Sequence, residues 1–300
     1  IVISVAIVGV LIANLDFREF SHEVTSFSFK FFPVLLLLML LANGLRALRW
    51  RVILPTRKQV SNRHLFEGIM VGYTASYLLP LRAGEFVRAF YISKIEDVSF
   101  SGAFASVVTE RVFDVLAVLA ALAICIGYMP SVPPIVSIGA KSIGFFALVV
   151  TVMIIWAYVA PRVILKFAYL ACRLVTGRPF SSLSRKVVGG AREFISGLQA
   201  LSGVRDLVIV VIYSVAIMLC YIGFYTLFVA AMGAETTLLM GAVVAVSIAL
   251  AIAAPSAPGF IGTYQAGCVI ALTSIFGLSQ AFSVAYSVVT HVMQAAVTIV

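Results

Sequence analysis

Hydrophobic residues in this chain fall into long unbroken runs. Five runs are long enough to cross a membrane: Phe31–Leu48, Ser106–Tyr128, Ile138–Ala160, Leu207–Met232 and Gln280–Val300. A helix that spans a bilayer needs about 20 mostly apolar residues, so each run predicts a spanning helix. The strands of a membrane β-barrel would instead alternate apolar and polar residues over about ten positions, so the pattern excludes a barrel.

Composition agrees with this pattern. Of the 300 residues, 62% are hydrophobic and 11% are charged, whereas a soluble domain carries roughly 25% charged residues. The sequence therefore predicts an all-α polytopic membrane protein with about eight transmembrane helices, including two broken or re-entrant hairpins. A further apolar stretch, Ile1–Leu15, is interpreted as the remainder of a first span in a chain trimmed from a slightly longer protein.

Positive charge is concentrated in two segments. Six cations lie between residues 46 and 63, and seven lie between residues 161 and 192. Because cytoplasmic loops are enriched in Lys and Arg, both segments are predicted to be cytoplasmic. Three connections with little positive charge are predicted to face outward: Asp16–Lys30, Tyr128–Ser137 and Gly233–Thr237. Basic segments of this kind are attracted to anionic lipid head groups, and nothing else in the sequence supports nucleic-acid binding.

The same pattern suggests how the chain is divided. We expect one membrane domain over residues 1–300, with a first half at 1–160 and a second half at 206–300. The connection at 161–205 is basic, and its apolar residues between Leu183 and Leu201 recur at helical spacing. That spacing predicts an amphipathic helix on the inner membrane surface.

Two further apolar segments are interrupted. Leu65–Pro80 is followed by Leu81–Ile92, which is half apolar and half charged, and Leu238–Ala254 continues as Thr263–Phe276 after Pro255–Gly262. Proline removes a backbone donor and glycine loosens the chain, so both interruptions should free polar backbone groups. At membrane depth, such breaks occur only inside protein or beside water.

The distribution of positive charge also indicates on which side of the membrane each broken segment begins and ends. The first broken segment must leave from the cytoplasmic side and return to it, and the second must leave from the outer side and return there. Each segment is either a re-entrant hairpin or a pair of spans. Because they enter from opposite faces, they have the pattern of an inverted-topology repeat whose broken helices meet around a substrate.

Six charged residues lie within or beside apolar sequence. Arg82, Glu85 and Arg88 are spaced by three, and Glu110, Arg111 and Asp114 follow in the next long run. A charge at the bilayer centre costs roughly 2.5–3.5 kcal/mol on insertion scales, so these groups must pair or line a wet cavity. Two interpretations remain open, an ion-pair network that joins helices and a site for a phosphate.

The phosphate interpretation gives each residue a role. Arginine binds phosphate through two donors and stays charged when buried. We expect Arg82 and Arg88 to bind an anionic head group, with Glu85 and Glu110 orienting them, and Arg111 and Asp114 to form a structural pair. The second break is predicted to complete the substrate site from the other side through four residues: Pro258, Gly259, Gly262 and Gln265.

Catalytic and metal-binding motifs are absent from the sequence. It contains no Gly-x-Ser-x-Gly, no His-Glu-x-x-His and no Gly-rich phosphate loop, and the carboxylates lack a nucleophile with an evident base. The three histidines and four cysteines show no ligand-like spacing. We therefore expect no cofactor and no metal, and a transporter in preference to an enzyme.

Several motifs together resemble a known family. They are Arg49-Trp-Arg51, Leu79-Pro-Leu-Arg-Ala-Gly-Glu-Phe-Val-Arg88, Glu110-Arg-Val-Phe-Asp114 and Pro255-x-x-Pro-Gly-x-x-Gly262. In this order they resemble the transmembrane region of the lysylphosphatidylglycerol synthase family, also described as flippase-like integral membrane proteins. The soluble aminoacyltransferase half of the two-domain members is not in these 300 residues. The family's second break often continues to an acidic residue, whereas this chain has Tyr264-Gln265.

The resemblance implies a lipid translocase in the cell (inner) membrane of a bacterium or archaeon. Its substrate would be an anionic phospholipid or a polyprenyl-phosphate-linked lipid. The alternative is a membrane-embedded transferase, or an accessory subunit of a lipid-modifying or glycosyl-transferring enzyme. A third hypothesis is a scaffold that only binds lipid or a partner enzyme. Expected partners are an anionic lipid and such an enzyme, without nucleic acid. Whether the protein forms a homodimer is left open.

Overall fold

The structure is a computed structural model. It describes residues 2–13, 15–55, 60–79, 83–128, 203–253 and 257–299, with isolated positions between 163 and 192. The predicted span Ile138–Ala160, the predicted amphipathic helix at 183–201, most of the basic connection 161–192, and Arg82 lie outside the described residues.

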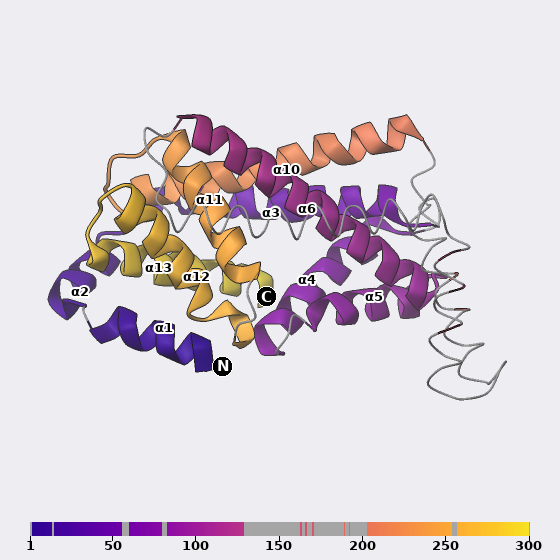
Figure 1. Cartoon of the computed structure of the whole chain (residues 1–300), viewed down its shortest axis with the longest axis horizontal. Helices are drawn as coiled ribbons and strands as arrows, with labels where there is room; N and C mark the ends of the chain where they lie inside the picture. The colour runs from indigo at the N-terminus through magenta and orange to yellow at the C-terminus, as the bar shows by residue number, and fades with distance from the viewer. Residues whose placement is uncertain are drawn as a thin grey trace.

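Long apolar helices form the frame of the described part, which contains helices and no strands. Four of them are long and apolar enough to cross a membrane: α3 (Phe32–Ile53), preceded by the short turn η1 (Phe29–Phe31), α6 (Phe100–Tyr128), α10 (Val204–Ala231) and α13 (Gln280–Ile299). Figure 1 shows α3, α6 and α10 running along the long axis of the molecule. The prediction of an all-α polytopic membrane protein is confirmed.

Two helices extend further than the apolar runs. The run Phe31–Leu48 becomes α3, which continues to Ile53, and the run that begins at Ser106 becomes α6, which begins at Phe100. The prediction that residues 46–53 belong to a basic loop is wrong, because Arg46, Arg49 and Trp50 are buried inside the bundle. The guanidinium groups pair with carboxylates of α6 inside the protein, so the helix does not end where the cations begin.

The first broken segment forms a hairpin of two short helices, α4 (Asn62–Leu78) and α5 (Gly84–Ile95), seen in Figure 1 beside one half of α6. They have 17 and 12 residues, hence lengths of about 25 and 18 Å, below the roughly 30 Å hydrocarbon core. The hairpin returns to the end where it began, because the Glu96 carboxylate accepts a hydrogen bond from the Ser61 N–H at 2.9 Å. It is therefore a re-entrant hairpin.

Glycines hold the two helices of this hairpin in close contact. A Cβ atom on Gly84 would collide with the Gly72 carbonyl oxygen, and one on Gly72 would lie 2.9 Å from the Arg88 Cβ. The glycines within α4 thus permit backbone approach, as small residues do between membrane helices. The helix itself is continuous to Leu78, and the interruption follows it.

The second broken segment is also a hairpin. It consists of α11 (Leu238–Ala253), the short turn η2 (Pro258–Phe260), and α12 (Thr263–Val269) with its π-helical extension η3 (Ile270–Ile275). Within the break, Gly259 and Gly262 adopt φ angles of +69° and +89°, which side-chain-bearing residues rarely adopt. A Cβ atom on Gly267 would lie 2.8 Å from the Ile248 Cα, so glycine again sets the helix contact.

The two breaks meet each other inside the bundle. A Cβ atom on Gly259 would lie 3.2 Å from the Tyr77 Cδ1 at the end of α4. The Tyr77 ring is 6.5 Å from the Phe260 ring and 5.8 Å from the His291 ring, centre to centre. Segments almost two hundred residues apart in the sequence thus share one aromatic contact.

Two of the predicted outward connections, Asp16–Lys30 and Gly233–Thr237, lie at one end of the molecule, and the third, Tyr128–Ser137, lies outside the described residues apart from Tyr128. The Ser28 N–H donates to the Ala231 carbonyl at 2.7 Å, and the Ser26 hydroxyl donates to the Met232 carbonyl at 3.4 Å. The short helix α2 (Phe17–Thr25) lies here against α13, and α1 (Val2–Ala13) runs along the second hairpin (Figure 1). The Ser4 hydroxyl accepts a hydrogen bond from the Ala257 N–H at 2.9 Å.

Two apolar cores flank the site described next. One surrounds Phe224, Phe228 and Tyr286, where α10, α11 and α13 pack together. The other surrounds Trp50 and Leu65, where the first hairpin packs against α3 and α6. The charged residues of the sequence prediction lie beside this second core.

Candidate functional site

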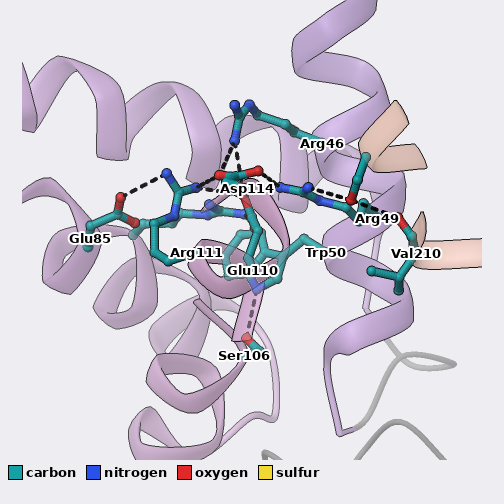
Figure 2. A network of polar contacts seen from close by, with 11 residues as sticks. Arg46, Arg49, Trp50, Glu85, Ser106, Glu110, Arg111, Asp114 and Val210 are labelled. Carbon is teal, nitrogen blue, oxygen red and sulfur yellow. Dashed lines mark hydrogen bonds and ion pairs between the residues drawn. The ribbon is translucent and has the colours of Figure 1, made fainter. Parts of the chain in front are cut away.

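Seven charged side chains from three helices form one network. We call it the ionic cluster, and its members are Arg46 and Arg49 of α3, Glu85 and Arg88 of α5, and Glu110, Arg111 and Asp114 of α6. Figure 2 shows the two α6 carboxylates at the centre of the network, with arginines on several sides. The structure thus joins every described charge predicted from the first half and adds two arginines.

Glu110 lies at the centre of the ionic cluster. Its side chain is fully buried, with 0% of its surface exposed. Four guanidinium groups surround its carboxylate, at 2.7 Å for Arg88, 2.8 Å for Arg111, 3.2 Å for Arg49 and 3.4 Å for Arg46. Because Glu110 is fully buried ten residues after the start of α6, its carboxylate is surrounded by protein groups.

Asp114 follows one helical turn later and lies on the same face of α6. Its carboxylate pairs with Arg46 at 3.0 Å, with Arg111 at 3.1 Å and with Arg49. Arg49 also donates to the Ser214 hydroxyl of α10 at 2.9 Å. The ionic cluster therefore connects α3, α5, α6 and α10.

The structure describes two of the predicted arginines, Arg88 and Arg111. Of these, Arg88 is the more deeply buried. Its guanidinium carbon lies 3.7 Å from the centre of the Trp50 ring, and the Trp50 indole N–H donates to the Ser106 hydroxyl at 2.7 Å. Stacking on one side and Glu110 on the other leave Arg88 only 4% exposed. Its role as a head-group ligand stays a prediction, and so does that of Arg82.

Arg111 and Glu85 form the open edge of the ionic cluster. The Arg111 side chain is 33% exposed and the Glu85 side chain 27%, and the two are 3.4 Å apart. Arg111 also contacts Asp114, as the predicted structural pair requires, but it is the most accessible arginine of the network. A ligand that enters from this edge meets Arg111 first.

The ionic cluster carries a surplus of positive charge. Four arginines face three carboxylates, which leaves one positive charge in excess among the described residues. The Nε atoms of all four arginines lack a hydrogen-bond partner within the described part of the chain. In a medium of low dielectric constant this surplus attracts an anion strongly. The described residues contain no group of three metal-ligating side chains.

The second break has a different polar network. The Gln265 side-chain oxygen accepts a hydrogen bond from the Gly262 N–H at 2.7 Å, and its Nε2 lies 3.1 Å from the His291 Nδ1. The Tyr264 ring stacks on the His291 ring at 4.4 Å. These contacts hold the start of α12. Of the predicted residues Pro258, Gly259, Gly262 and Gln265, Gly259 lies against Tyr77 of the first hairpin, whereas the ionic cluster takes its residues from α5 of that hairpin.

Sequence reasoning missed two of the four arginines. Arg46 and Arg49 were assigned to a topological signal, and the partners Trp50, Ser106 and Ser214 were not identified. One signal was available, because Arg46 and Arg49 are three residues apart and so share one face of a helix. Their partners on α6 are more than sixty residues away, beyond the reach of local patterns.

Comparison with known proteins places the chain in a family. A glycosyltransferase named AglD from Haloferax volcanii is 25% identical over 285 residues, which cover 85% of this chain and 45% of that protein. This chain therefore spans less than half the length of that relative. No solved structure matches the chain. The family described as the lysylphosphatidylglycerol synthase TM region matches residues 1–300, and this multi-pass membrane protein belongs to that family.

Proposed function

We propose that this protein moves an anionic lipid between the two leaflets of a cell membrane, and that the lipid phosphate engages the ionic cluster. The observation that carries the proposal is the uncompensated positive charge at a buried site with one open edge. Charged residues within membrane segments are costly and mark substrate pathways. A phosphodiester would supply the one negative charge that the network lacks.

Arg111 is the residue we expect to meet the phosphate. It is the most exposed arginine of the ionic cluster, and its contact with Glu85 is one of the two longest in the network, at 3.4 Å. A phosphate can replace the Glu85 contact without disturbing Glu110. The planar guanidinium then offers two donors to two phosphate oxygens.

The two hairpins support a transport function. Each is too short to cross the membrane as a straight pair of spans, and they touch through Tyr77 and Gly259. Paired broken helices of this kind line substrate sites in transporters that expose one site to each side in turn. We place the end of α3 with the segment that follows it up to Arg63, and the basic connection 161–192, toward the cytoplasm. Since the sequence has no nucleotide-binding motif, movement would be downhill or coupled to an ion.

Leaflet exchange in proteoliposomes tests the proposal. Fluorescent phosphatidylglycerol and fluorescent phosphatidylcholine are compared in the parent protein, in Arg111→Gln and in the control Arg18→Gln, an exposed arginine of α2. Loss of a charge-assisted contact is worth about 1.5–3 kcal/mol, so Arg111→Gln should slow phosphatidylglycerol exchange at least about tenfold. The control should exchange lipid like the parent. Undiminished exchange in a folded Arg111→Gln protein would contradict the proposed role of the ionic cluster.

A second function has one observation in its favour. The relative from Haloferax volcanii is named a glycosyltransferase, and this chain matches 45% of it. The chain would then serve as the membrane part of a transferase, or as an accessory subunit that presents a lipid to one. Product formation by a co-reconstituted transferase that requires this chain, in vesicles without any leaflet exchange, would favour this function over translocation.

A further inference from the structure

A long apolar groove lies on the bundle, and none of the residues that line it belongs to the ionic cluster. It has a volume of about 1210 Å³ and lies between α2, α3, α4 and α13. Its walls are mainly aliphatic and aromatic side chains, among them Phe29, Leu36, Leu40, Met70, Val292 and Ala296. Pockets for small ligands usually measure about 300–1000 Å³, so this groove suits a longer molecule.

The groove follows the helices through most of the membrane thickness. Phe29 lines it just before α3 begins, and Phe66 lines it near the start of α4. Since α4 follows directly after the end of α3, these two residues mark opposite ends of the bundle. The 22 residues of α3 are about 33 Å long, close to the thickness of a bilayer core.

One end of the groove is charged. Glu67 and Tyr91 line this end, and the Glu67 carboxylate accepts hydrogen bonds from the Tyr91 hydroxyl and the Arg63 Nε, each at 2.8 Å. The Arg63 side chain is 84% exposed. Glu67 engages only Nε, so the terminal nitrogens of the guanidinium stay available to an anion.

The chemistry of the walls favours a hydrocarbon chain as the occupant. The aliphatic walls offer van der Waals contact but no hydrogen bond. Because lipid tails are as apolar as leucine, burying a tail gains little from the hydrophobic effect in a bilayer. Preferential binding therefore requires the charged end.

We propose that the groove binds one lipid molecule, with a hydrocarbon chain along α3, α4 and α13 and its phosphate at Arg63. Glu67 holds the guanidinium in place, and Tyr91 holds Glu67. This site is separate from the ionic cluster, and the lipid bound here need not be the transported one. A test of this lipid site therefore does not depend on whether the protein translocates lipid.

Lipid retention tests this site directly. The full chain is reconstituted with equal amounts of phosphatidylglycerol and phosphatidylcholine, extracted in mild detergent, and analysed by mass spectrometry for lipid bound per protein. Ala296→Trp narrows the groove and should lower retained lipid at least about tenfold, while Arg63→Gln should abolish the preference for phosphatidylglycerol. Ala123→Trp, at an exposed alanine of α6, and Arg18→Gln are the matched controls and should behave like the parent.

Three outcomes would overturn the proposal. The first is equal retention in Ala296→Trp and Ala123→Trp, and the second is an unchanged preference in Arg63→Gln. The third is a shift from dimer to monomer in Ala296→Trp without loss of lipid, which would identify the groove as an interface between copies. If Ala296→Trp does not fold, a phosphatidylglycerol with a photoreactive tail is applied to the parent. Labelling of α3 and α13 in preference to α6 and α10 then supports the proposal, and even labelling overturns it.

Discussion

Replacing Glu110 with glutamine tests whether the ionic cluster is an energetic unit. The substitution keeps the size of the side chain and removes its charge. Glu110 is fully buried and lies within 3.4 Å of four guanidinium groups. Glu110→Gln therefore raises the excess positive charge of the described network from one to two, at a position that water does not reach.

The expected loss follows from the geometry. Removal of one partner from a buried ion pair costs about 3–5 kcal/mol, because the remaining charge is left without a counter-ion. Glutamine still accepts one hydrogen bond through its oxygen, so we expect a loss near the lower value, about 3 kcal/mol. Glu85→Gln is the matched control. Glu85 is partly exposed and has one ion pair among the described residues, with Arg111 at 3.4 Å, so its loss should stay below about 1 kcal/mol.

The free energy of unfolding is measured by titrating dodecyl maltoside micelles with sodium dodecyl sulfate and following circular dichroism. A double-mutant cycle then isolates the pair between Glu110 and Arg49. Arg49→Met together with Glu110→Gln returns the network to one excess charge. The double variant should therefore be more stable than the sum of the single losses predicts, by about 1–3 kcal/mol.

Two results would refute this reasoning. A loss below about 1 kcal/mol for Glu110→Gln, indistinguishable from Glu85→Gln, would mean that water reaches Glu110. Strict additivity in the cycle would mean that Arg49 and Glu110 do not interact, although their atoms lie 3.2 Å apart. Either result would also remove the evidence that the excess positive charge lies in a buried network, and the proposed phosphate site rests on that evidence.

Two further predictions concern the first hairpin. Gly84→Ala places a Cβ against the Gly72 carbonyl and should lower the free energy of unfolding by about 2 kcal/mol or more. Gly127→Ala is the control: its Cβ meets no atom within 4 Å, so it should raise the free energy of unfolding by up to about 1 kcal/mol. Unfolding in detergent measures both changes. The pKa of the Glu96 carboxyl is lowered, first by the hydrogen bond from the Ser61 N–H, so its contribution to stability is present above the ordinary pKa and is lost as pH falls through the lowered one. Thermal unfolding of Glu96→Gln should accordingly depend less on pH between about pH 6 and pH 3 than that of the parent, and an unchanged pH dependence would contradict this.

The spanning helices could be predicted because lipid imposes a simple rule. A helix in hydrocarbon must be apolar over its length, so α10 and α13 follow their predicted runs to within three residues. The breaks could be located for the complementary reason, since Pro255 and the glycines after it cannot continue a regular helix. The bounds of α11 and of Thr263–Ile275 agree with that reasoning.

The ionic cluster could be predicted only in part. Glu110 and Asp114 stood out because they interrupt an apolar run. Arg46 and Arg49 did not stand out, because they precede a basic stretch. The positive-inside rule uses the number of cations in a segment and not the direction of each side chain. Contacts between helices depend on crossing positions, such as the approach of α10 that brings Ser214 to Arg49, and no local pattern encodes these.

The α4–α5 hairpin links the ionic cluster to the rest of the molecule. Its Arg88 contacts Glu110 at 2.7 Å, its Glu67 lines the groove, and its Tyr77 touches the second break. Because glycines keep the two helices in backbone contact, a shift of one helix displaces the other. The Gly84 and Glu110 predictions are thus connected: Gly84→Ala should move Arg88 away from Glu110, and Glu110→Gln should then cost less stability in the Gly84→Ala background than in the parent. Equal costs in both backgrounds would show that Arg88 keeps its place without the close helix contact.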